Sequence, residues 1–242
     1  ANLYKFKDNN NKNLESITVE NYYDNNNLIS IPLDKRFSIH VNASRYFKKY
    51  NKLKNALEIV SIQKEDAKKE IEYLESIIYE LESSKNISDI NEIYTELSCN
   101  PIFAEYFKIK KDSTKNKDEK KNSSPREYTI DGYTVLVGKN NVQNDYLTTK
   151  LADKNDIWFH TKDIHGSHVI LKNNSSTELP SNDILIKCAQ IAAFYSKAKL
   201  SSNVPVDYCF VKYVKKVSGS KPGMVIYTNN KTLTVTPSDP NL

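Results

Sequence analysis

A heptad repeat of apolar residues between Ala43 and Leu81 is the feature that most constrains the fold of this chain. Counted from Ala43, eleven of the twelve a and d positions are apolar or aromatic, and only Lys64 interrupts the pattern. Such a repeat is typical of a coiled coil, because it keeps one apolar stripe along one side of a helix. The sequence therefore predicts a long helix, on the order of 60 Å at about 1.5 Å per residue. The predicted seam consists of Ala43, Tyr50, Leu57, Lys64, Ile71 and Ile78 at a, and Tyr46, Leu53, Val60, Ala67, Leu74 and Leu81 at d.

A shorter helix is predicted to return after a turn at residues 83–87. Ser88 is the expected N-cap, and the apolar stripe of the second helix is Ile90, Ile93, Tyr94 and Leu97. The helix should end near Pro101, so residues 40–107 are expected to form an antiparallel helical arm. The first half of the long helix would then pack on residues 102–107, on a second copy or on another domain.

Charge divides the long helix into a basic root at residues 45–54 and an acidic distal half at residues 65–82. Two interpretations stay open: the charges are solvated flanks of a coiled coil, or the arm projects a binding tip.

Residues 1–39 and 108–124 are predicted to flank the arm without a core of their own. The first segment has short strands at 3–6, 17–19 and 28–31, and is expected to be the remnant of a preceding domain. The second carries seven lysines and no apolar periodicity, which predicts a flexible, basic linker.

Residues 125–242 show mixed periodicity and predict a compact, mostly antiparallel α+β domain. Asp131-Gly132 predicts a tight hairpin turn, and Asn229-Asn230 could join the last two strands. The fold class is thus α+β, a helical coiled-coil arm followed by this domain. The expected strands are 126–130, 133–137, 157–161, 168–172, 208–214, 224–228 and 232–236, and the expected helices are 142–152 and 182–199, the latter with Ser181 as N-cap.

Two alternating stretches, 155–161 and 167–172, predict a hairpin with an unusual face. A turn centred near Ile164 would set His160 opposite His168 and Trp158 opposite Ile170. The only tryptophan and two of the four histidines would then share one face.

Composition excludes several classes of protein. The mean hydropathy is −0.63, and no apolar run approaches the roughly 18 residues of a membrane span. No secretory leader pattern opens the sequence, and the three cysteines are odd in number and far apart. We therefore expect a cytoplasmic protein with no membrane partner, disulfide or structural zinc.

Metal binding and nucleophilic catalysis fit the motifs poorly, and phosphate binding fits them better. His160, His165 and His168 match no common zinc spacing, and no acidic or cysteine ligand lies beside them. Ser167 and His168 are adjacent on a strand and point to opposite faces, so they form no triad by themselves. The turn at residues 138–141 could bind phosphate at the start of a helix, although it is not a P-loop.

Nucleic-acid binding accounts for more of these features. Trp158 and the histidines offer planar surfaces to unstacked bases, and Asn140, Gln143 and Asn144 could contact base or sugar edges. The alternative is that Trp158 is a core residue and the lysines are ordinary surface. The lysines expected to contact phosphates are Lys139, Lys162, Lys212, Lys215, Lys216 and Lys221.

Several motifs together resemble the NFACT family. The C-terminal ones are similar to its RNA-binding domain: Gly138-Lys-Asn-Asn-x-Gln-Asn-Asp-x-Leu-Thr148, Asp156-Ile-Trp-Phe-His160 and Gly166-Ser-His168. The upstream ones are similar to its helical region: Pro32-Leu-Asp34, Asn42-Ala-x-x-Tyr-Phe-Lys-Lys-Tyr-x-Lys-x-Lys54, Glu72-Tyr-Leu-Glu75 and Glu92-Ile-x-x-Glu-Leu97. One departure is His165, which stands where the family usually has proline.

The resemblance implies a factor of ribosome-associated quality control. Its expected partners are RNA and the stalk base of the large ribosomal subunit, tRNA and the nascent-chain complex, with self-association through the coiled coil as a further option. Longer members support template-free alanine tailing, so no catalytic residue and no cofactor is expected in this chain. An older label in the family leaves the alternative of a surface adhesin for fibronectin.

The resemblance also implies site residues. The RNA-binding set is Lys139, Asn140, Gln143, Asn144, Trp158, His160, Ser167 and His168, with Asp156 and Gly166 as structural support. The tip of the coiled coil would comprise Glu82, Ser84, Lys85 and Asp89.

Overall fold

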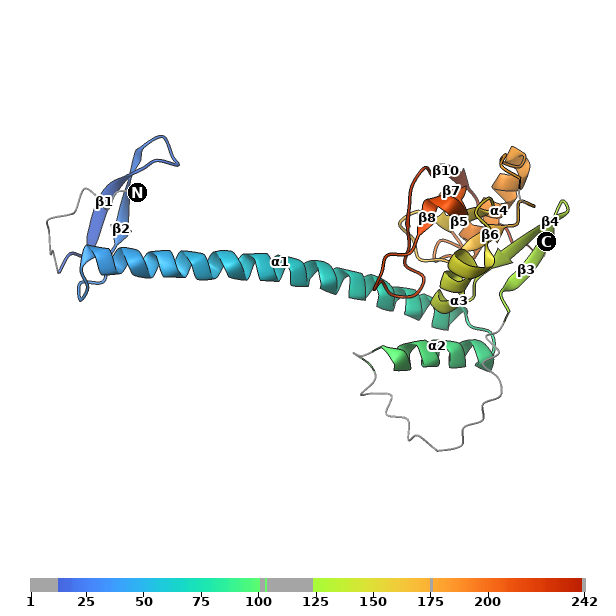
Figure 1. Cartoon of the computed structure of the whole chain (residues 1–242), viewed down its shortest axis with the longest axis horizontal. Helices are drawn as coiled ribbons and strands as arrows, with labels where there is room; N and C mark the ends of the chain where they lie inside the picture. The colour runs from blue at the N-terminus through green and yellow to red at the C-terminus, as the bar shows by residue number, and fades with distance from the viewer. Residues whose placement is uncertain (1–12, 101–102, 104–123, 175, 241–242) are drawn as a thin grey trace, which may run out of the picture. The chain divides into compact units, whose positions relative to one another are not determined.

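The computed structural model of the chain describes residues 13–100, 103, 124–174 and 176–240. Contacts divide it into two compact units, residues 1–69 and residues 70–242 (Figure 1). The strand predicted at 3–6 and the predicted basic linker, apart from Ser124, lie outside the described residues. The domain boundaries proposed from the sequence stay a prediction.

The first unit contains a β-hairpin and the first part of a long helix. Strands β1 (Ser16–Asn21) and β2 (Asn27–Pro32) pair antiparallel, with Val19 opposite Ile29. Helix α1 (Ile39–Ser83) follows. The buried Asn42 side chain fixes its start, because it accepts from the amide of Asp34 and donates to the carbonyls of Asp34 and Phe37.

The second unit begins with the distal part of α1 and the returning helix α2 (Ile87–Cys99). The N-cap of α2 is Asn86, whose side chain accepts from the amide of Asp89 at 2.9 Å. The prediction of Ser88 as N-cap is therefore wrong by two residues, since the Asn86 side chain already fills the capping role.

The register predicted for the coiled-coil seam is wrong where α2 packs on α1. Tyr73, Leu74 and Ile77 of α1 form an apolar cluster with Ile93 and Leu97 of α2. Only Leu74 of the α1 residues in that cluster belongs to the predicted seam, and its neighbours Ile71 and Ile78 are 56% and 52% exposed. The short α2 packs on the flank of α1 because Tyr73 also donates a hydrogen bond to the buried Glu96 at 2.8 Å.

A six-stranded antiparallel sheet with helices beside it follows in the second unit, which confirms the α+β class. The strand order is β10-β7-β5-β6-β4-β3. Helix α3 (Asn141–Tyr146) continues into a π-helical turn, η2 (Leu147–Leu151), and α4 (Asn182–Phe194) covers one face of the sheet. The strands of the sheet are β3 (Arg126–Ile130), β4 (Tyr133–Val137), β5 (Ile157–Thr161), β6 (Val169–Leu171), β7 (Val204–Phe210) and β10 (Lys231–Val235).

The two faces of the sheet carry separate apolar clusters. Ile157 and Phe159 of β5 point towards α4, whereas Trp158 points to the opposite face and packs with Leu147 and Ile170. This alternation is the one expected of a strand. The Trp158 face also meets the segment that contains η3 (Val211–Tyr213), β8 (Val214–Lys215) and β9 (Ile226–Tyr227).

Some local predictions in this domain are confirmed and others are wrong. Asp131-Gly132 forms the predicted turn, with φ of 48° and 84°. Asn229-Asn230 does not close a hairpin, because β9 pairs with β8 and β10 pairs with β7. Helix α4 ends at Phe194 rather than Lys199, since Tyr195 and the following residues bond to the turn between β5 and β6 instead.

Candidate nucleic-acid interface

The β5–β6 hairpin brings together the rings that the sequence placed on one face. Trp158 lies opposite Ile170, as predicted. Its ring stacks on His160 at 5.7 Å between centroids, meets the edge of His168 at 5.3 Å, and contacts Tyr227 at 4.7 Å. Trp158 is fully buried, so in this structure it supports the face rather than offering a ring to a base.

The two histidines on this face are neutral at physiological pH. Burial lowers the pKa of His160 to about 4. Burial, and next the neighbouring His160, hold the pKa of His168 well below its usual value. The Nδ1 atom of His168 shares a hydrogen bond with the hydroxyl of Thr148 at 2.8 Å. Neither imidazole therefore carries the positive charge that a phosphate contact would use.

The turn between β4 and α3 is held by its own amide side chains. Asn140 caps α3 by accepting from the amide of Gln143 at 2.8 Å, and Gln143 accepts from the amide of Lys139. Asn144 accepts from the amide of His168 at 2.9 Å. A Cβ at Gly138 would lie 2.1 Å from the Asn144 side chain, so the close approach requires glycine.

All three of these predicted RNA-binding amides are buried. Asn140 and Gln143 hold the turn itself, and Asn144 joins it to the residue before β6. The sequence did not reveal this structural role.

The remaining predicted residues of the hairpin are also internal. The amide of Ser167 donates to the carbonyl of Tyr195, and a Cβ at Gly166 would lie 2.9 Å from Ser196. Asp156 is buried, where it accepts from the amides of Asp153 and Asn173 and pairs with Lys172 at 2.5 Å. These contacts fix both ends of the hairpin.

Acidic residues of α1 and α2 contact the outer side of this site. Glu92 accepts from the side-chain amides of Asn140 at 2.6 Å and Gln143 at 3.1 Å. Asp89 lies 4.0 Å from the Lys139 ammonium group. We call Glu70, Glu75, Asp89 and Glu92 the acidic cover, and their partners Lys139, Asn140, Gln143, His165 and Lys221 the donor set.

Two carboxylates of α1 also contact the domain, and the Asn141 side chain donates to the Ser76 hydroxyl at 2.9 Å. Glu75 lies 3.2 Å from Nε2 of His165, and Glu70 lies 3.0 Å from the Lys221 ammonium group. One signal for these pairs is present in the sequence, the run of acidic residues in the distal half of the long helix. Their partners could not be read from it.

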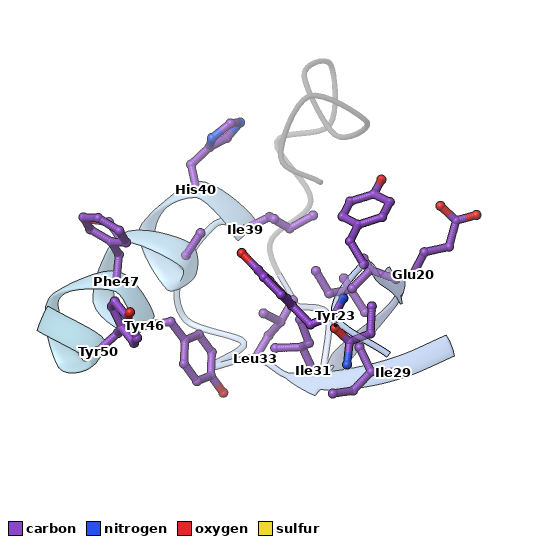
Figure 2. Close-up of a pocket in the computed structure, with 16 residues that line it drawn as sticks. Glu20, Tyr23, Ile29, Ile31, Leu33, Ile39, His40, Tyr46, Phe47 and Tyr50 are labelled. Atoms are coloured by element: carbon purple, nitrogen blue, oxygen red, sulfur yellow. Dashed lines mark hydrogen bonds between the residues drawn. The ribbon is translucent and has the colours of Figure 1, made fainter. Parts of the chain in front are cut away.

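Two cavities differ in character and in relation to the predicted site. A cavity of about 520 Å³ lies between α1 and the Trp158 face, where His160, His165 and Tyr227 meet Glu72 and Glu75. An apolar groove of about 850 Å³ lies in the first unit and contains none of the predicted RNA-binding residues. Figure 2 shows it, with aromatic and aliphatic side chains from both the hairpin and α1 along its walls: Tyr23, Ile29, Ile31, Tyr46, Phe47 and Tyr50.

The predicted tip residues do not share one environment. Glu82 and Lys85 are exposed near the turn between α1 and α2, and the Ser84 hydroxyl donates to the carbonyl of Glu80. Asp89 is buried beside Lys139. Of the four predicted tip residues, only Glu82, Ser84 and Lys85 are therefore placed for a contact at the exposed turn.

Several lysines remain accessible to phosphate. Lys162, Lys212 and Lys215 are exposed, and Lys212 also lies over the rings of Phe210 and Tyr213. Lys216 is paired with Asp145 at 2.6 Å.

Among the described residues, no group of three or more His, Cys, Asp or Glu side chains is arranged to hold a metal ion. None of the described helices is long and apolar enough to cross a membrane.

Comparisons with known proteins decide the family. Residues 1–121 match the family model described as NFACT N-terminal and middle domains, and residues 126–229 match the NFACT protein RNA binding domain. This chain belongs to the NFACT family.

Curated NFACT relatives extend over nearly the whole sequence. The chain is 43% identical over 239 residues to the Rqc2 homolog RqcH of Bacillus subtilis, which is 98% of this chain and 40% of that protein. It is 41% identical over 225 residues to RqcH of Streptococcus suis, which is 93% of this chain and 39% of that protein. The chain thus spans about 40% of the length of these curated relatives.

A solved structure from Streptococcus suis has a similar fold. It is the C-terminal part of the fibronectin/fibrinogen-binding protein from Streptococcus suis, which matches with a TM-score of 0.70 and 40% identity. The match covers 82% of this chain and 76% of that one. Residues 126–229 of this chain are accordingly an RNA-binding domain of the NFACT type.

Proposed function

We propose that this chain is the RNA-binding part of a longer factor of ribosome-associated quality control. The observation that carries the proposal is the match of residues 126–229 to the NFACT RNA-binding domain. The extended similarity to RqcH proteins supports the ribosomal setting. In this proposal the chain acts in the cytoplasm and binds RNA of a large ribosomal subunit that still carries peptidyl-tRNA.

The longer protein would recruit tRNA and support template-free addition of alanine to the stalled nascent chain. The chain itself would contribute binding and no catalytic group, because the bond-forming chemistry takes place on the ribosome. The turn between α1 and α2, with Glu82, Ser84 and Lys85, would approach the stalk base.

Residues 1–39 would be the end of a preceding domain in the longer protein, and the body of that domain would cover the apolar groove of Figure 2. Chemical footprinting of Tyr46 and Tyr50 in a longer chain tests this part of the proposal. Protection relative to the 242-residue chain supports it, and equal labelling contradicts it.

The accessible lysines around the Trp158 face are the proposed phosphate contacts. RNA affinity at low salt comes mainly from such contacts, and each one lost lowers the salt dependence of binding. The variant Lys212→Gln/Lys215→Gln should therefore weaken binding to deacylated total tRNA and reduce the slope of log K against log salt by about one to two. Trp158→Ala is a poor probe, since the side chain is buried and its loss would disturb the fold.

A matched control comes from the opposite face of the sheet. Lys187 lies on α4 and pairs with Asp131, and Lys199 follows that helix. Lys187→Gln/Lys199→Gln removes the same charge and should leave the salt slope unchanged. Equal effects of both double variants would mean that binding follows net charge and that the proposed face is wrong.

A second candidate function comes from the solved relative, whose name includes fibronectin and fibrinogen. In that case the chain would bind immobilised fibronectin in physiological salt, and the two lysine variants would not distinguish the faces. Absence of saturable fibronectin binding by a folded, RNA-binding chain would remove this candidate.

A further inference from the structure

The groups that α1 and α2 contact on the RNA-binding domain are hydrogen-bond donors. The donor set offers two ammonium groups, two side-chain amides and an imidazole, and each meets a carboxylate of the acidic cover. Carboxylate and phosphate oxygens are both anionic acceptors, and ammonium and amide groups bind either one. A donor that binds a carboxylate is therefore also able to bind an RNA phosphate.

The contact between the helices and the domain lacks an apolar core. The described residues form three hydrophobic clusters, of which two lie wholly within residues 126–240 and one wholly within α1 and α2. None of the three joins the helices to the domain. The two parts are held by polar contacts, which water and salt can replace more readily than a packed apolar interface.

Several carboxylate oxygens at this contact are buried without a hydrogen-bond partner. They include Oε1 of Glu70, Oδ1 of Asp89 and, on the domain side, Oδ1 of Asp145. A buried acceptor that forms no hydrogen bond destabilises the state that buries it. The contact thus contains groups that would be better satisfied once the helices and the domain separate.

We propose that the acidic cover is an intramolecular competitor of RNA, so that RNA must displace α1 and α2 from the donor set before it binds there. This inference rests on the proposed function. It explains why three residues that the family motif places at the RNA site, Lys139, Asn140 and Gln143, are turned towards carboxylates. A bound state would exchange those carboxylates for phosphates.

The decisive variant removes charge from the cover and keeps its shape: Glu70→Gln/Glu75→Gln/Glu92→Gln. The expected result is tRNA binding tighter by about tenfold, because the apparent affinity rises with the fraction of molecules whose site is open. The control is Glu58→Gln/Glu127→Gln/Glu178→Gln, which removes the same charge from exposed positions outside both the cover and the predicted tip. The control should change the affinity about twofold at most, as an effect of net charge alone.

Each outcome decides the matter. A larger gain in the cover variant than in the control supports competition. Equal gains in tRNA affinity would mean that only net charge matters. A loss of affinity in the cover variant would mean that the carboxylates position the donors. Either result overturns the inference and leaves the proposed RNA-binding function intact. Failure of all three folded proteins to bind tRNA at low salt would overturn the proposed function and the competition together.

Hydrogen exchange gives an independent measurement on the unmodified chain. If RNA displaces the cover, amides of α2 should exchange faster when tRNA is added, because the helix loses its contact with the domain. Slower or unchanged exchange in residues 87–99 at saturating tRNA would contradict the inference.

Discussion

The substitution Glu96→Gln should remove a large pH dependence from the stability of the second unit. Glu96 is buried between α1 and the domain, where it accepts the hydrogen bond of Tyr73. Burial, which outweighs the hydrogen bonds from Tyr73 and Asn141, raises the pKa of this carboxyl from 4.5 to about 7. The folded chain therefore holds a proton on Glu96 over a pH range in which the unfolded chain has lost it.

The sign and size of the effect follow from linkage. Between pH 4.5 and about 7 the folded state binds more protons than the unfolded state, so its stability falls as the pH rises. A shift from 4.5 to about 7, at 1.36 kcal/mol per pKa unit, corresponds to a loss of about 3 kcal/mol by pH 8. Glu80 contributes in the same direction, because burial and the neighbouring Glu96 raise its pKa as well.

Urea unfolding followed by circular dichroism measures this effect. Glutamine resembles the protonated carboxyl, so the difference in free energy of unfolding between wild type and Glu96→Gln should shift by about 3 kcal/mol between pH 4.5 and pH 8. His160 and His168 act in the opposite direction, since burial lowers their pKa values, but they are common to both proteins and cancel. Glu58→Gln, at an exposed position of α1, is the control. A difference that stays constant with pH would refute the assignment of a protonated Glu96.

Three further substitutions test the packing. Leu74→Pro should cost about 3 kcal/mol or more and lower the helicity seen by circular dichroism, because proline interrupts α1 where α2 packs; unchanged helicity would contradict the packing of α2. Gly138→Ala should lower stability by about 1–3 kcal/mol in urea unfolding, as the new Cβ overlaps the Asn144 side chain, and a neutral effect would show that the turn can relax. Asp156→Ala should cost about 3 kcal/mol by thermal unfolding, since it leaves two backbone amides without their acceptor and removes one of the two carboxylates that pair with Lys172. A change below about 1 kcal/mol would show that water replaces the carboxylate.

The local elements of the C-terminal domain were predictable from the sequence because short-range signals specify them. Alternation placed β5 and set Trp158 opposite Ile170, and the Asp131-Gly132 pair specified a hairpin turn. The same signals failed where tertiary contacts decide. Helix α4 ends early because the turn before Ser167 takes its next backbone groups, and β10 pairs with β7 although β9 precedes it in the chain.

The candidate site shows a different limit of sequence reasoning. The motif residues Asn140, Gln143 and Trp158 are all buried there. The Asn140 side chain accepts from the backbone amide of Gln143, and the side chains of Asn140 and Gln143 both donate to Glu92 of α2. A sequence pattern shows that residues are close to a site without showing which of them face outwards. The predicted register of the coiled-coil seam was wrong for a related reason. A continuous apolar stripe does not reveal that a 13-residue helix will pack beside it.

Binding of the 242-residue chain to purified large ribosomal subunits over a salt series tests the central claim most directly. The account predicts saturable binding that weakens steeply with salt, with a shallower salt slope for Lys212→Gln/Lys215→Gln and an unchanged slope for Lys187→Gln/Lys199→Gln. Binding that is indifferent to salt, or no binding by a folded chain at low salt, would contradict an RNA-binding role for this part of the protein.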